Sequence, residues 1–124
     1  MKSFLIVTAF IEAGTGLALL VVPAFVVKLL LGVEISGAVI PLGRVAGVAL
    51  LVLGLACWFA SGDTKSRAAR GLNTAMLLYN LGVAVVLGVA GIQSQKFGIA
   101  LWPAVMLHAA MAVGCIACLR RKSV

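Results

Sequence analysis

The chain has 124 residues, of which 64% are hydrophobic and only 10% are charged. This composition excludes an ordinary soluble domain, in which charged residues approach a quarter of the total. The net charge is +7, but the basic residues flank apolar runs, which indicates membrane topology and argues against nucleic acid as a partner. Four spans of about 20 residues would take up roughly 80 positions and leave only short connections and tails. We therefore expect a single membrane domain over residues 1–124.

The first predicted span covers residues 4–22 and ends at Pro23, which cannot continue a helix without losing a hydrogen bond. Its apolar start is similar to a signal peptide, but Glu12 interrupts the run and no typical cleavage site follows. We expect the segment to be retained. The next apolar stretch, residues 24–31, is too short to cross a bilayer and contains Lys28. It predicts a short interfacial segment at the level of the lipid headgroups.

Three further apolar runs predict the remaining spans. The second span covers residues 38–60, with Pro41 in the first turn, where its missing N–H costs nothing. The third covers residues 72–91, with Ser66 as a candidate N-cap upstream, and the fourth covers residues 98–119. Backbone polar groups in hydrocarbon must be satisfied within helices. The predicted fold class is therefore all-α: an integral membrane, up-down four-helix bundle with a short interfacial segment after the first span.

The basic residues are distributed unevenly between the two sides of such a bundle. The side without the termini holds only Lys28 and Lys96. The side with both termini holds Lys2, Lys65, Arg67, Arg70, Arg120, Arg121 and Lys122. The positive-inside rule then places both termini in the cytoplasm. We expect a multi-pass protein of a bacterial-type inner (plasma) membrane, with the lipid bilayer as its first partner.

Each predicted span carries one residue that is costly in hydrocarbon: Glu12, Arg44, Asn80 and His108. With a rise of about 1.5 Å per residue, three of them reach the bilayer midplane, and the long side chain of Arg44 could reach Glu12. Tyr79 adds a hydroxyl beside Asn80. The sequence thus predicts a polar cluster of Glu12, Arg44, Tyr79, Asn80 and His108.

Two interpretations of this cluster remain open. In the first, a buried ion pair between Glu12 and Arg44, tied to Asn80 and His108, fixes the register of the helices. In the second, the cluster is a polar pocket that binds a small molecule, a lipid headgroup or a proton, with Glu12 and His108 as the titrating groups. A pathway through the bilayer is less favoured, because the sequence has no detectable inverted repeat.

Small residues predict where helices approach closely. Gly43 and Gly47 form a G-x-x-x-G motif, and Gly14, Gly71 and Gly114 each have an alanine four residues away. Such spacings pack helices within one bundle or between copies of a chain.

Cys115 and Cys118 form a C-x-x-C motif, and Cys57 is expected at the same end of the bundle. The tetrapeptide is similar to that of quinone-linked membrane disulfide oxidoreductases, but no second cysteine pair is available to pass electrons on. His108 and Cys115 stand about 10 Å apart along a helix, too far for one zinc ion. We therefore predict no metal, no cofactor and no catalytic residue, which leans against an enzyme.

The segment from Glu12 to Leu17, in a span that ends at Pro23, and the segment from Leu42 to Gly47 resemble small four-helix bacterial membrane proteins of the DoxX-like kind. The resemblance implies a fold and a membrane location, with no catalytic residues to carry over. We predict a non-catalytic accessory or scaffold protein that forms a homo-oligomer or joins a larger membrane complex. The alternative is a small-ligand-binding or proton-coupled, transporter-like protein that uses the polar cluster.

Overall fold

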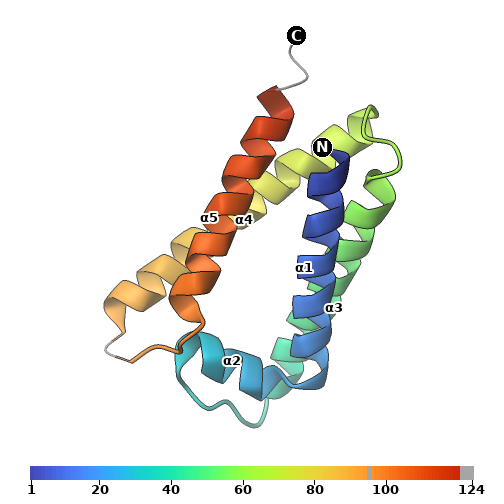
Figure 1. Ribbon diagram of the computed structural model, residues 1–124. Helices are drawn as coiled ribbons and strands as arrows, with labels where there is room; N and C mark the ends of the chain where they lie inside the picture. Colours follow the sequence, from blue (N-terminus) through green and yellow to red (C-terminus); the bar gives the residue numbers. More distant parts are fainter. Residues whose placement is uncertain (95, 121–124) are drawn as a thin grey trace.

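The computed structural model describes residues 1–94 and 96–120, which form five helices and no strand. All of them except the second are long and apolar enough to cross a membrane, which confirms the predicted all-α membrane fold (Figure 1). The basic residues Arg121 and Lys122 lie outside the described residues. The helices are α1 (Lys2–Val21), α2 (Pro23–Leu31), α3 (Val39–Ala60), α4 (Arg67–Gln93) and α5 (Leu101–Arg120).

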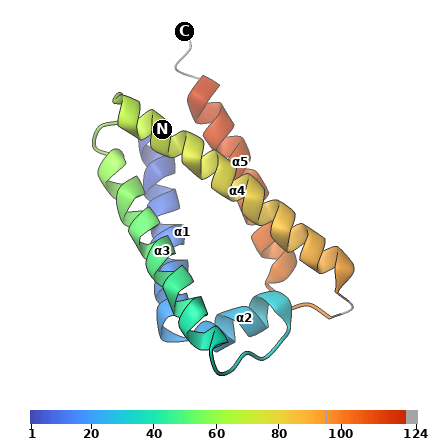
Figure 2. The same ribbon diagram turned by 180° about the vertical axis from the view of Figure 1, so that it is seen from behind.

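Helix α4 begins earlier than hydrophobicity alone predicts, and the reason is its N-cap. The side chain of Ser66 accepts a hydrogen bond from the backbone N–H of Ala69 at 3.1 Å, so the basic turn from Arg67 to Arg70 is helical. With 27 residues, α4 is about 40 Å long, more than the thickness of a bilayer core. It runs obliquely to α1 and α3, as Figure 2 shows.

The long helices are arranged as two antiparallel pairs, α1 with α3 and α4 with α5 (Figures 1 and 2). Glycine sets the spacing in the first pair. A Cβ added at Gly47 would lie 2.7 Å from the carbonyl oxygen of Gly16, and a Cβ at Gly54 would lie 2.8 Å from the backbone N of Ala13. Only hydrogen fits at these positions, so the two backbones lie almost in contact.

The five glycines predicted to pack helices divide into two groups. Gly43 lies against Pro23, Gly47 against α1, and Gly114 against the ring of Phe4. Gly14 and Gly71 are exposed, and a Cβ at either would have nothing within 4 Å. The α1 glycine that meets α3 is Gly16, because two residues turn a helix by about 200° to the opposite face.

The helix pairs meet at the end of the bundle that carries the termini, and we call this the closed end. Its core consists of Leu5, Ala9, Cys57, Met76 and Cys115, which come from all four long helices and are at most 4% exposed. Toward the opposite end the two pairs diverge (Figure 1). We call this second region the open end.

Helix α2 crosses the open end from α1 toward the start of α5 (Figure 1). It is the short segment predicted after the first span. The backbone N–H of Gly98 donates to the carbonyl of Leu30 at 3.1 Å, and that of Ala100 donates to Leu29 at 2.9 Å. A side chain at Gly98 would run into the carbonyl of Leu29, so glycine is required for this contact. Residues 98–100, predicted as the start of the fourth span, instead pair with α2.

Candidate functional site

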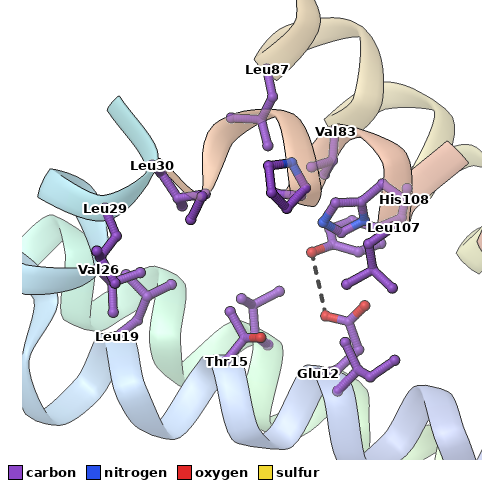
Figure 3. A pocket seen from close by; sticks show the side chains of 16 residues that line it. Glu12, Thr15, Leu19, Val26, Leu29, Leu30, Val83, Leu87, Leu107 and His108 are labelled. Atoms are coloured by element: carbon purple, nitrogen blue, oxygen red, sulfur yellow. Dashed lines mark hydrogen bonds between the residues drawn. The ribbon is translucent and has the colours of Figure 1, made fainter. Parts of the chain in front are cut away.

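A cavity of about 450 Å³ lies between the two helix pairs at the open end. Sixteen residues line it, and they come from all five helices and from Ala100 before α5 (Figure 3). Most of the lining is leucine, valine and other apolar side chains. The polar exceptions are Glu12, Thr15, Tyr79 and His108.

Glu12 lies on the buried face of α1, one turn after Ala9 and one turn before Gly16, and is only 2% exposed. One carboxyl oxygen, Oε2, accepts a hydrogen bond from the hydroxyl of Tyr79 at 3.4 Å. The other oxygen, Oε1, is fully buried and has no hydrogen-bond partner in the described part of the chain. A buried acceptor without a partner is destabilising, so this atom needs an explanation.

Arg44 does not join Glu12, and the expected ion pair is not formed. Arg44 is on an exposed face of α3, next to Gly43, which packs on Pro23. Glu12 lies at the level of Gly54, about 15 Å further along α3. The one ion pair among the described residues joins Lys28 to Glu34 on the surface.

His108 is held by Asn80, whose amide is itself oriented by its own helix. Asn80 Nδ2 donates to the carbonyl of Met76 at 2.8 Å, which leaves Oδ1 to face His108 Nδ1, also at 2.8 Å. Because an amide oxygen only accepts, Nδ1 of His108 carries the proton, and in the neutral ring Nε2 is an acceptor. No described residue is bonded to Nε2.

Tyr79 connects the two groups. Its hydroxyl donates to Glu12, and its ring meets the ring of His108 edge to face with a centroid distance of 5.7 Å. The structure thus brings together four of the five residues of the predicted cluster, Glu12, Tyr79, Asn80 and His108, and leaves Arg44 apart. Figure 3 shows Glu12 and His108 pointing toward each other from opposite walls of the cavity.

Asn73 is a buried polar residue that the sequence analysis did not single out. It is 0% exposed, and its Nδ2 donates to the carbonyl of Cys115 at 3.0 Å, which ties α4 to α5. Its Oδ1 has no partner among the described residues. The available signal was its spacing, because Asn73 precedes Asn80 by two helical turns and shares its face.

The thiols at the closed end are part of the packing. Cys57 and Cys115 are fully buried in the core, and both are free, as is the partly buried Cys118. Within the described ranges, no group of three or more His, Cys, Asp or Glu residues is placed to hold a metal ion.

The site is therefore an apolar chamber with its polar atoms gathered at one end, beside the packed core. Glu12 and Thr15 come from α1, Tyr79 from α4 and His108 from α5, so both helix pairs contribute to that end. Comparisons with protein-family models, with curated proteins and with solved structures find no match to this chain.

Proposed function

We propose that this protein binds a small amphipathic molecule inside the membrane, with the polar part at Glu12 and His108 and the apolar part in the chamber. One observation carries the proposal. Glu12 lines a cavity large enough for a ligand, and its Oε1 is buried without a partner among the described residues. An unmade hydrogen bond of this kind costs about 1–3 kcal/mol, and a ligand donor would remove that cost.

The size and lining of the chamber support the same function. Small-molecule sites usually measure about 300–1,000 Å³ and are apolar with a few convergent polar groups. At about 450 Å³, this cavity falls in that range. Leu19, Leu29, Leu30 and Leu87 surround the part away from Glu12 (Figure 3).

The scaffold hypothesis from the sequence receives less support. It relied on small residues as contact points for other chains. Gly43, Gly47 and Gly114 are covered by Pro23, α1 and Phe4 of the same chain, which leaves only Gly14 and Gly71 of the five glycines exposed to a partner. We therefore place ligand binding ahead of a role as a subunit of a homo-oligomer or of a larger complex.

For the location, we propose a bacterial-type inner membrane with both termini in the cytoplasm. Five described basic residues support this orientation, because they lie at the start of α1, around the start of α4 and at the end of α5, which are all at the closed end: Lys2, Lys65, Arg67, Arg70 and Arg120. Cysteine substitutions at Lys65 and Lys96, each made in the native chain, test it with a membrane-impermeant maleimide on intact cells. Only Lys96→Cys should react above the native background, and labelling of Lys65→Cys alone would reverse the orientation.

Photolabelling tests the binding function itself. A long-chain alcohol with a diazirine, added to membranes that contain the protein, should reach the cavity and label Glu12, although Glu12 is buried. Peptide mass spectrometry locates the label. The same measurement on Glu34, which is exposed in the loop after α2, reports the labelling that mere surface contact produces.

Matched variants on α5 provide the control. Ala104→Phe places a ring in the cavity, whereas Ala110→Phe adds the same ring at an exposed position outside it. Labelling of Glu12 should fall in the first variant and persist in the second. Equal labelling in both variants would reject the cavity as the binding site.

A further inference from the structure

The polar atoms that remain free at the end of the cavity can all accept hydrogen bonds. Glu12 Oε1 has no partner, and His108 Nε2 accepts because Nδ1 is bonded to Asn80. Thr15, one turn after Glu12 on α1, also lines the cavity. The hydroxyl of Thr8 is bonded to the carbonyl four residues earlier, whereas no bond of this kind is made by Thr15 within the described residues.

No lysine or arginine lines the cavity among the residues that the structure describes. Lys28 is paired with Glu34 at 2.7 Å, and Arg44 lies about 15 Å along α3 from the level of Glu12. No ion pair within 4 Å joins His108 to Glu12 in the described ranges. A carboxylate at Glu12 therefore has no counter-charge from the part of the chain that is described. In a membrane interior, an unpaired charge of this kind is strongly unfavourable.

A protonated amine satisfies both requirements at once. Its N–H groups provide several donors for Glu12 Oε1, His108 Nε2 and the Thr15 hydroxyl, and its positive charge neutralises the carboxylate. A hydroxyl offers one donor and no charge, and a carboxylate offers no donor and repels Glu12. We infer that the ligand is a lipophilic amine whose ammonium group sits between Glu12 and His108. This inference rests on the proposed function and specifies the chemistry of its ligand.

Three probes that share one apolar body distinguish which polar group the cavity prefers in a ligand. Adamantylamine, adamantanol and adamantanecarboxylate share the same hydrocarbon cage and differ in the group attached to it. Binding to the full chain in detergent micelles at neutral pH is measured by isothermal titration calorimetry. The amine should bind about tenfold or more tighter than the alcohol, since charge-assisted hydrogen bonds are roughly twice as strong as neutral ones. The carboxylate should not bind.

Glu12→Gln is the decisive variant because it keeps the shape of the side chain and removes the charge. Because one partner of a buried charge pair is lost, the affinity for adamantylamine should fall by about thirtyfold, and the affinity for adamantanol should stay nearly unchanged. Glu12→Asp, which keeps the charge, should retain a preference for the amine. Circular dichroism confirms that each variant is folded. The affinities of the three probes for the native chain test the inference without any variant, so it stays testable if Glu12→Gln does not fold.

The outcomes separate this inference from the function on which it rests. Equal affinity of the native chain for the amine and the alcohol would overturn the inference that the ligand is an amine. An unchanged preference for the amine in folded Glu12→Gln would overturn it as well. If the native chain binds the alcohol and Ala104→Phe does not, the cavity would still be supported as the binding site. Absence of binding by all three probes, together with equal photolabelling of the two α5 variants, would reject both proposals.

Discussion

The closed end and the open end are built from the same four helices but differ in how those helices meet. At the closed end, Leu5 packs with alanine, cysteine and methionine to form the core, and Gly114 lets the ring of Phe4 approach α5. At the open end, leucine and valine side chains face a space that they do not fill. The comparison teaches that the packed core and the cavity proposed for binding are separated along one bundle, with Glu12 at the boundary between them.

Leucine truncation at the two ends should give the largest contrast. Leu5→Ala removes a side chain that is 0% exposed in the core and should cost about 3 kcal/mol. Leu107→Ala, at a cavity position that is 41% exposed, should cost less than about 1 kcal/mol. Unfolding by dodecyl sulfate in mixed micelles, followed by circular dichroism, measures both. Equal losses would show that the two ends are packed alike.

The contact between α1 and α3 sharpens the comparison, because it runs from the closed end to the open end. Gly47→Val places carbon atoms against the backbone of Gly16 and Leu20 and should destabilise the protein by about 2 kcal/mol. Gly14→Val makes the same change on an exposed face and should stay within about 0.5 kcal/mol. The same unfolding assay applies, and a large effect at Gly14 would reveal a contact outside this chain.

Asn73 tests a polar contact within the closed end. Asn73→Ala removes the hydrogen bond from α4 to the carbonyl of Cys115 and should cost about 1 kcal/mol, as is usual for such bonds in membranes. Thr74→Ala is the neighbouring control, since its hydroxyl bonds only to its own helix at Arg70. A thermal midpoint lowered equally in both variants would argue against a tie between the helices.

The smallest effect is expected at the surface of the open end. The bond between Lys28 and Glu34 lowers the pKa of Glu34 below its ordinary 4.5 and raises the pKa of Lys28 above its ordinary 10.5. The contribution of Glu34 to stability is therefore complete above pH 4.5 and is lost as the pH falls through its lowered pKa. The contribution of Lys28 to stability is complete below pH 10.5 and is lost as the pH rises through its raised pKa.

Glu34→Gln should accordingly lower the thermal midpoint slightly at neutral pH and low salt, because both partners are exposed. The difference from the native chain should vanish in strong acid and at high salt. A difference that persists under either condition would mean that Glu34 acts through something other than this ion pair.

The spans and most of the polar cluster could be predicted from the sequence because both depend on distance along a helix. Apolar runs gave the four spans, and depth brought Glu12, Asn80 and His108 to one level. The resemblance to DoxX-like proteins stays a prediction.

Predictions that depend on the face of a helix were less successful. Arg44 has a suitable reach but lies on an exposed face, and Gly16 packs on α3 in place of Gly14. These helices are apolar on all sides, so hydrophobicity does not mark the inner face. The cavity could not be predicted from the sequence for a similar reason, because a leucine that lines a cavity and a leucine in a packed core are indistinguishable in a sequence.

The hydrogen bonds between α2 and the segment before α5 join parts of the chain that are synthesised far apart in time. The carbonyls of Leu29 and Leu30 receive their donors from Gly98 and Ala100, which the ribosome adds only after α3 and α4 have been made. The chamber therefore has no complete wall while the chain is being inserted. Backbone pairing completes that side as the final hairpin docks, so a chain that stops before residue 98 lacks the contact that joins α2 to α5.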